Sequence, residues 1–492
     1  MAPWGFYGRS RESEQLSQIL DRRRWFFVSI TGRRRIGKTT LVEQTVKSRP
    51  DRPVFYVQIP DSEEAGVVST VNDALDAFQI PTNIAARPHS LLEFVKLIEI
   101  LVRAGYIVVL DEFQYFSRKR FAGFCSLLQA MVDRLNSIGT GQKLVLGGLI
   151  VLGSIYTEMM ALLEDRSAPL YARTTDKFDL PHLDIAAVCN LIKDHADFSP
   201  DRLLFLWNLF EGVPKFYRDC YERQVLNADR PTLLRKIFFE SASPLRTEAE
   251  NWFLHELQGR YDTVLKFVAR NPGRLHGDLV DAVRQAGGRK TDDQIGGYLQ
   301  VLIDRYRLIE KKLPVFAAEK SRKGRYYLSD NFLQTWLGVL ANPVAARNFR
   351  SLDQLVATAV DNLNNVEGFA FERLVSQLYE ERSRKGLEGF PLQAKIGGYW
   401  NRGDVEIDLV AVNEDDRRIR FGSCKRSSGR LVEDVNNFRG HVSRFLEAFP
   451  KYKSWGIEHV GIAPVVDNEV RSTLRHYGVL AEDLVDLTRD LA

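Results

Sequence analysis

The sequence predicts a multidomain α/β protein, and three observations lead to this fold class. Its 492 residues correspond to about three domains, at a prior of about 150 residues per domain. Strand-like apolar runs alternate with helical patterns over residues 1–180, and the same alternation returns after residue 366. Strands separated by helices are typical of parallel sheets. We therefore expect two α/β units with a mostly helical region between them.

Composition narrows the class of protein. The chain is 45% hydrophobic and 27% charged, which is typical of globular proteins and excludes collagen-like and wholly disordered chains. The formal net charge is only +4, so a surface that binds nucleic acid must be a local patch. The four cysteines are scattered without metal-like spacing, which favours a reducing compartment over a disulfide framework.

No segment of the sequence predicts export or membrane insertion. The N-terminus lacks an apolar targeting segment, and the longest apolar run is residues 144–152. That run has about half of the ~20 residues that a membrane span needs. We expect a soluble, cytoplasmic protein without a membrane partner.

The order of predicted elements sets the domain boundaries. Apolar runs predict four strands in the first region, at residues 25–30, 53–59, 106–110 and 144–152. An amphipathic helix is expected at residues 91–102, and residues 181–236 are helical in pattern until the Pro-containing segment 241–247. We place the five domains at residues 1–180, 181–243, 244–340, 341–366 and 367–492.

The third and fifth domains have recognisable element orders. Three helices and then two short strands are expected in the third domain, at residues 262–270, 275–285, 292–306, 308–316 and 325–328, which is the order of a winged helix. Residues 341–366 predict a helical connector. The fifth domain predicts strands at residues 405–412, 418–424 and 459–464.

A phosphate-binding motif follows the first strand directly. Residues 32–39 read GRRRIGKT and fit the pattern G-x-x-x-x-G-K-[ST] between a strand and a helix. In this motif backbone N–H groups wrap the phosphates of a nucleotide such as ATP, Lys38 reaches the outer phosphates and Thr39 binds Mg²⁺. The predicted nucleotide-binding residues are Gly32, Arg33, Arg34, Arg35, Ile36, Gly37, Lys38, Thr39 and Thr40.

The third predicted strand ends in two acids, Asp111 and Glu112, about 70 residues after the phosphate loop. This is the form of a Walker B strand. Asp111 is expected to hold Mg²⁺, and Glu112 to polarise the water that attacks the γ-phosphate. The predicted catalytic residues of this site are therefore Lys38 and Glu112.

Two further polar residues are candidates for phosphate contacts. The fourth strand ends near Ser154, whose hydroxyl is expected either to sense the γ-phosphate or to cap a helix. Arg173 is expected either to contact a phosphate, in the same chain or in a neighbouring subunit of a homo-oligomer, or to be an ordinary surface charge.

Together these motifs resemble the archaeal-type P-loop ATPases of the STAND/AAA+ group, which carry a winged helix and a C-terminal nuclease-like domain. Residues 6–12 look like the family's F-x-G-R-x-x-E box, and this resemblance implies that Arg9 lies close to the adenine pocket. Residues 212–217 are similar to the family's lid motif, in which Pro214 packs near the base. Ala172 stands where the family usually has glycine.

The resemblance extends to the winged helix, through residues 298–336. The hairpin of this domain is strongly basic, and such a density of charge suits phosphate backbones. Its cations are Lys311, Lys312, Lys320, Arg322, Lys323 and Arg325. Two interpretations are open: the winged helix binds DNA, or it packs on the ATPase as a nucleotide-sensing element.

Acidic residues cluster in the fifth domain. Asp404, Glu406 and Asp408 share one face of a predicted strand, because side chains alternate with period two. Adjacent carboxylates are costly unless a cation neutralises them. A helical Glu372 precedes this strand, and the next strand ends in Lys425.

This arrangement resembles the PD-(D/E)xK nuclease core. The resemblance implies that Glu372, Glu406 and Asp408 hold Mg²⁺, and that Asp408 and Lys425 are catalytic. Ser423 stands where the family usually has an acid two residues before the lysine. The sequence leaves open whether this domain cleaves DNA or only binds it.

The function predicted from the sequence is an ATP-hydrolysing P-loop switch with an α/β core, a helical lid, a winged helix and a restriction-endonuclease-like domain. Nucleotide state would be coupled to DNA engagement. The alternatives are an ATP-gated, metal-dependent DNA endonuclease, or a signalling scaffold whose degenerate nuclease domain binds a protein partner.

Overall fold

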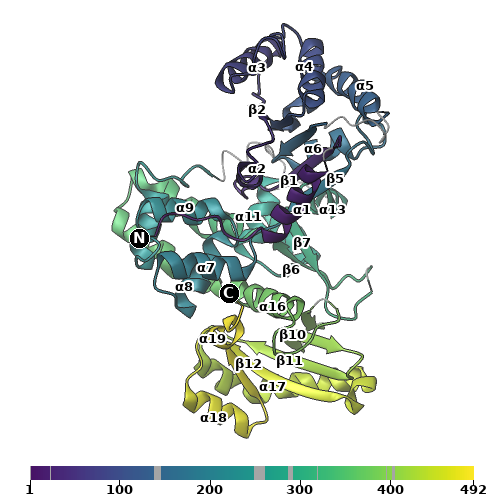
Figure 1. Cartoon of the computed structure of the whole chain (residues 1–492). Coiled ribbons are helices and arrows are strands. Elements are labelled where there is room, and N and C mark those ends of the chain that lie inside the picture. The colour runs from purple at the N-terminus through teal and green to yellow at the C-terminus, as the bar shows by residue number, and fades with distance from the viewer. Residues whose placement is uncertain are drawn as a thin grey trace. The chain divides into compact units, whose positions relative to one another are not determined.

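The computed structural model divides into two compact units, which are residues 9–182 and residues 1–8 with 183–492 (Figure 1). It describes residues 2–22, 24–137, 146–248, 261–285, 292–318, 320–394, 396–401 and 405–491. Asp404 and part of the predicted strand at 144–152 lie outside the described residues. Among the residues that are described, no helix is long and apolar enough to cross a membrane.

The first unit is built on a five-stranded sheet with the order β2-β3-β4-β1-β5, in which every neighbouring pair is parallel. The strands are β1 (Phe27–Gly32), β2 (Val54–Gln58), β3 (Ile107–Asp111), β4 (Gly148–Gly153) and β5 (Asp176–Leu180). Residue Thr31 of β1 pairs with Gly153 of β4. The carboxyl ends of β3, β4 and β1 therefore meet at one edge of the sheet.

Helices cover this sheet. Helices α3 (Glu64–Ala77), α4 (Leu91–Arg103) and α5 (Phe124–Asn136) share a hydrophobic core with strand residues such as Phe55 and Val108. The residues that alternate with these along β1, β3 and β4 are buried too, as expected for a parallel sheet covered on both faces. The remaining helices of the unit are α1 (Ser10–Asp21), α2 (Lys38–Lys47) and α6 (Tyr156–Leu163).

The second unit begins with a helical region. Its helices are α7 (Ile185–His195), α8 (Pro200–Phe210), α9 (Pro214–Glu222) and α10 (Arg230–Leu234). The buried carboxylate of Glu381, on a later helix, accepts hydrogen bonds from the first two backbone N–H groups of α7, those of Ile185 and Ala186, at 2.7 and 3.2 Å. An acid at a helix N-terminus satisfies donors that have no partner inside the helix. This contact ties the C-terminal half of the chain to α7.

The middle of the second unit contains three helices and a small antiparallel sheet. The helices are α11 (Asp262–Arg270), α12 (His276–Gln285) and α13 (Asp292–Gln300). The sheet has the order β6-β8-β7, with β6 (Arg274–Leu275), β7 (Ile309–Lys312) and β8 (Arg325–Leu328). Strands β7 and β8 form a hairpin. Two short helices follow, α14 (Asn331–Thr335) and α15 (Ala341–Ala345).

The C-terminal part is a mixed sheet flanked by helices, with the order β13-β12-β11-β10-β9. The long helix α16 (Leu352–Arg384) leads into it. Strands β9 to β11 pair antiparallel, and β11 to β13 pair parallel. The other elements are β9 (Gly397–Trp400), β10 (Glu406–Asn413), β11 (Arg418–Cys424), α17 (Ser428–Ala448), β12 (Gly456–Ala463), α18 (Asn468–His476), β13 (Leu480–Asp483) and α19 (Leu484–Thr488).

The structure corrects some of the expected elements. The connector expected at residues 341–366 and the helix that carries Glu372 are joined, because α16 runs without a break from Leu352, with an apolar face from Leu355 to Leu378 that Gly368 does not interrupt. The predicted boundary at residue 366 therefore lies inside α16. Strands β5, β9 and β13 were not expected from the sequence, since they are short and only partly apolar. The helix expected at residues 91–102 is confirmed as α4, and the side chain of Ser90 caps it.

Candidate functional site

The phosphate loop joins β1 to α2 through left-handed backbone. Arg35 has φ 67° and Gly37 has φ 95°. Gly32 has φ 149°, and a Cβ atom there would lie 2.9 Å from the carbonyl oxygen of Leu180. Glycine is the residue type that adopts such backbone without strain, so the two glycines allow the loop to curl around a phosphate-sized ligand.

Lys38 is buried at the start of α2 and is folded back on this loop. Its Nζ donates to the carbonyl oxygens of Gly32 at 2.9 Å and Arg33 at 3.1 Å. Burial lowers the pKa of Lys38 to about 8, although the carboxylates of Glu112 and Asp111 oppose this shift. A phosphate in the loop would give the ammonium group a charged acceptor in place of two neutral ones.

Asp111 ends β3 and is the centre of a hydrogen-bond network. Its Oδ2 accepts from the hydroxyls of Thr39 at 2.7 Å and Tyr56 at 2.9 Å, and its Oδ1 accepts from the backbone N–H of Glu112 at 2.8 Å. Burial, together with Asp111, raises the pKa of Tyr56. The structure thus brings together Thr39 and Asp111, the predicted Mg²⁺ ligands of this site. Tyr56 was missed, since a tyrosine in a strand gives no sign of what it faces.

Glu112 and Ser154 are also brought together, through a residue that the sequence analysis missed. The carboxylate Oε2 of Glu112 accepts from the hydroxyl of Ser154 at 3.1 Å and from the amide of Gln114. The amide oxygen of Gln114 accepts from the backbone N–H of Ser154 at 3.2 Å, and its side chain is fully buried. Gln114 therefore links the carboxyl end of β3 to that of β4. Its position two residues after the acidic pair is the only signal that could have found it.

Arg9, near the N-terminus of the chain, contacts the phosphate loop. It lies before α1 with φ 64°, and its guanidinium donates to the carbonyl oxygens of Pro181 and, at 3.4 Å, Ile36. Because Ile36 belongs to the phosphate loop, Arg9 contacts the loop backbone itself. Among the other loop residues, Arg34 and Thr40 are exposed, whereas Arg33 and Arg35 are half-buried.

Two of the residues predicted to lie near the nucleotide, Arg173 and Pro214, make other contacts or belong to the other unit. Arg173 forms a bidentate ion pair with Asp133 of α5, at 2.8 and 3.1 Å. Ala172 before it has φ 57°, the backbone region in which glycine is favoured. Pro214 is the first residue of α9 and belongs to the second unit.

A second candidate site lies in the C-terminal sheet. Asp408 of β10 accepts from the backbone N–H of Cys424 at 2.8 Å, and its Oδ2 lies 3.8 Å from Nζ of Lys425. The same Nζ lies 3.1 Å from Oδ2 of Asp434 on α17. Ser423 lines a cavity of about 260 Å³ with these three residues and Glu406. The side chains of the predicted pair, Asp408 and Lys425, therefore lie close together, and Asp434 forms an ion pair with Lys425.

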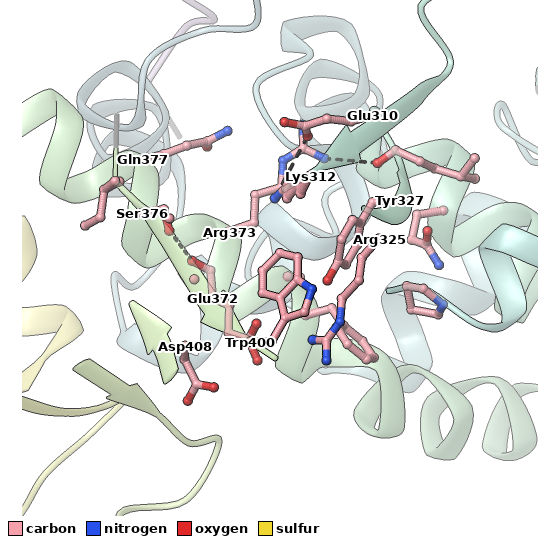
Figure 2. A pocket seen from close by; sticks show the side chains of 18 of the residues that line it. Glu310, Lys312, Arg325, Tyr327, Glu372, Arg373, Ser376, Gln377, Trp400 and Asp408 are labelled. Atoms are coloured by element: carbon pink, nitrogen blue, oxygen red, sulfur yellow. Dashed lines mark hydrogen bonds and ion pairs between the residues drawn. The ribbon is translucent and has the colours of Figure 1, made fainter. Parts of the chain in front are cut away.

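Glu372, on α16, faces a larger cavity of about 460 Å³ that Glu406 and Asp408 also line. Figure 2 shows Glu372 and Asp408 across this cavity from Arg325 and Tyr327. Burial raises the pKa of Glu372 to about 8, and the negative charges of Asp408 and Glu406 add to this shift. The carboxyl group is thus largely protonated at neutral pH.

The residues described here do not fit the metal site that the sequence predicted. Among them, no group of three or more Asp, Glu, His or Cys side chains is arranged to hold a metal ion. Glu406 is half-exposed and forms an ion pair of 2.5 Å with Arg325 of β8. The expected set of Glu372, Glu406 and Asp408 is therefore not assembled around one point.

The chain matches known families in two segments. Residues 6–216 match a family described as an ATPase domain predominantly from Archaea. Residues 336–436 match a family of archaeal and bacterial proteins of unknown function. The N-terminal segment is an archaeal-type P-loop ATPase domain.

Two proteins are similar to this chain over most of their length. A protein of Methanocaldococcus jannaschii, MJECL04, is 25% identical over 440 residues, which cover 85% of this chain and 87% of that protein. The solved structure of the Walker-type ATPase PABY2304 of Pyrococcus abyssi has a TM-score of 0.51 at 16% identity and covers 68% of this chain and 96% of that one. At this identity the likeness concerns the fold alone, which is that of a Walker ATPase.

The raised pKa of Glu372 makes a prediction about stability. The folded chain keeps a proton up to about pH 8, whereas the carboxyl group loses it near its ordinary pKa of 4.5 when the chain unfolds. Stability is therefore lost as the pH rises from about 4.5 to about 8, and the loss is complete above that range. Glu372→Gln removes this loss, so we expect it to raise the thermal unfolding midpoint by several degrees at pH 9 and to have little effect at pH 4.5.

The measurement is thermal unfolding of the full chain in EDTA at the two pH values. Glu380→Gln, which removes a carboxyl group from the same helix, is the matched control. A change of midpoint by Glu372→Gln that is equal at both pH values would contradict the assignment.

Proposed function

We propose that the chain is a Mg²⁺-dependent ATP hydrolase that acts as a nucleotide-controlled switch. The observation that carries this proposal is the hydrogen bond of 2.7 Å between Thr39 and Asp111. It joins the end of the phosphate loop to the end of the acidic strand, so that a hydroxyl and a carboxylate are adjacent at the place where a hard cation needs oxygen ligands.

Each residue around this contact has a role in the proposal. The N–H groups of residues 33–39 and the ammonium of Lys38 bind the phosphates, and Thr39 and Asp111 hold Mg²⁺. The ion supplies positive charge that offsets the charge of the phosphates. Glu112 orients and polarises the attacking water, and the network of Gln114 and Ser154 fixes its carboxylate in place.

Two substitutions separate binding from hydrolysis. Lys38→Ala should abolish the thermal stabilisation by ATP and Mg²⁺, which for a ligand at 100 times its Kd is worth about 2.7 kcal/mol in the wild type. Glu112→Gln should keep this stabilisation and lower kcat at least tenfold, since the carboxylate is needed only for the attack. Lys47→Ala, at the exposed end of the same helix, is the control. Stabilisation that persists in Lys38→Ala refutes the site.

The position of Gln114 predicts a distinct phenotype. Gln114→Leu removes the amide that holds Glu112 and Ser154 but keeps the size of the side chain. We expect kcat for ATP hydrolysis to fall about tenfold, which is ~1.4 kcal/mol of activation free energy, while Kd for ATP changes less than twofold. Gln44→Leu, the same change at an exposed position of α2, is the control. A loss of ATP affinity as large as the loss of kcat would contradict a role confined to Glu112.

A second function, DNA engagement by the other unit, is supported by its element order. Three helices followed by the β7–β8 hairpin, with β6 added to it, are typical of a winged helix. The mixed sheet with Asp408 and Lys425 at the ends of neighbouring strands is typical of a nuclease-like core. Ser423 and the ion pair of Glu406 favour binding over cleavage. The binding and hydrolysis of ATP would control when this unit engages DNA.

The test is incubation of the full chain with linear, junction and single-stranded DNA in Mg²⁺ or Mn²⁺, with and without ATP. We expect retention of DNA that depends on ATP and is weakened at least threefold by Lys425→Ala but not by Lys453→Ala, an exposed cation. Lys38→Ala should remove the effect of ATP. Cleavage that is lost in Lys425→Ala would favour the endonuclease alternative, and DNA binding that is equal in all variants would contradict a role for this site.

A further inference from the structure

Four charged side chains of the second unit form a closed network, in which two arginines each bridge the same two acids. Nη2 of Arg230 lies 2.8 Å from Oδ1 of Asp201, and its Nη1 lies 3.0 Å from Oε1 of Glu367. Nη2 of Arg426 lies 2.9 Å from the same oxygen of Asp201, and its Nε lies 2.6 Å from Oε2 of Glu367. The two positive and two negative charges balance one another.

The network joins three parts of this unit. Asp201 is on α8 and Arg230 is the first residue of α10, both in the helical region, whereas Glu367 is on the long helix α16. Helices α8 and α10 both pack against α16 (Figure 1). Arg426 is the second residue after β11, which ends at Cys424. The helical region, α16 and the C-terminal sheet therefore meet at these four charges.

Glu367 is the buried centre of the network. Its side chain is 0% exposed, whereas that of Asp201 is 59% exposed. A carboxylate that is removed from water is costly unless cations and hydrogen bonds compensate it, and losing one partner of such a group is destabilising. Glu367 therefore restrains its two arginines far more strongly than an ordinary surface ion pair restrains its members.

Arg426 directly follows Lys425, whose Nζ lies beside Asp434 and Asp408 in the smaller cavity. The backbone N–H of Lys425 donates to the carbonyl oxygen of Ile462, the next-to-last residue of β12, at 2.9 Å. The chain that carries Lys425 is thus held before this residue by the sheet and after it by the ion network.

We propose that Arg426 is a positioning residue for Lys425, and that the four-charge network makes the placement of Lys425 depend on helix α8. This inference rests on the proposed DNA engagement and gives the route by which the helical region regulates it. Arg426 is one peptide bond away from Lys425, so a shift of α8 that moves Arg426 also moves Lys425 relative to Asp408 and Asp434. Coupling between parts of a protein travels through such contiguous networks of charges and rigid helices.

The test uses two variants of the full chain, each with a matched control. Arg426→Ala leaves Glu367 paired with Arg230, so the fold is expected to survive, and Arg430→Ala, an exposed arginine of α17, is its control. Asp201→Asn removes the acid on α8. Its control is Glu222→Gln, which removes an acid of an exposed ion pair in the same helical region.

The first readout is the rate at which the amine of Lys425 reacts with acetic anhydride, measured by mass spectrometry. Release from Asp408 and Asp434 should raise this rate at least threefold in Arg426→Ala and at least twofold in Asp201→Asn, and the controls should match the wild type. The amine of Lys385, which pairs with Glu381 on α16, is the internal reference for general loosening of the fold.

An unchanged rate at Lys425 in Arg426→Ala overturns the positioning role, and so does an equal rise at Lys385. A rate that responds to Arg426→Ala but not to Asp201→Asn overturns the dependence on α8.

The second readout is retention of DNA. A positioning residue acts only through Lys425, so Arg426→Ala should weaken retention about threefold in the wild type and have no effect in Lys425→Ala. Equal weakening in both backgrounds would mean that Arg426 contacts DNA itself, which overturns the proposal. If the labelling rate responds and no form retains DNA, the positioning role stands and the proposed DNA engagement fails.

Discussion

The parallel register of the first sheet is the constraint on which the proposed nucleotide site depends. Strand β4 lies between β3 and β1, so the residues that end these three strands are neighbours although they are far apart in the sequence. This one arrangement sets the positions of Thr39, Asp111 and Ser154. A shift of one strand by one residue would turn Asp111 to the other face and break its contact with Thr39.

Much of the proposed nucleotide site could be predicted from the sequence, because its residues belong to short contiguous motifs. The phosphate loop and the acidic strand end were both found in this way, and the fold of a Walker ATPase is confirmed. Tyr56 and Gln114 could not be found, since their roles depend on which side chains meet across strands. That information lies in the register and not in any local pattern.

Less of the C-terminal site could be predicted from the sequence. The sequence predicts strands β10, β11 and β12 of this sheet, and the resemblance to a nuclease core implies the pair of Asp408 and Lys425, yet neither indicates what surrounds that pair. Asp434 comes from a helix that follows, and Arg325 comes from about 80 residues earlier in the chain. An acidic face that needs a cation can take it from a metal ion or from an arginine, and composition does not distinguish the two. The sequence also did not reveal that α16 is one helix across residue 366. A glycine in a helical pattern suggests that the helix ends there, but packing keeps this helix continuous.

The most direct test of the account is a crystal structure of the full chain with Mg²⁺ and a non-hydrolysable ATP analogue. We expect Nζ of Lys38 to leave the carbonyl oxygens of Gly32 and Arg33 for the phosphates, and the ion to lie between Thr39 and Asp111. A nucleotide bound elsewhere, with Lys38 still on those carbonyls, would contradict it.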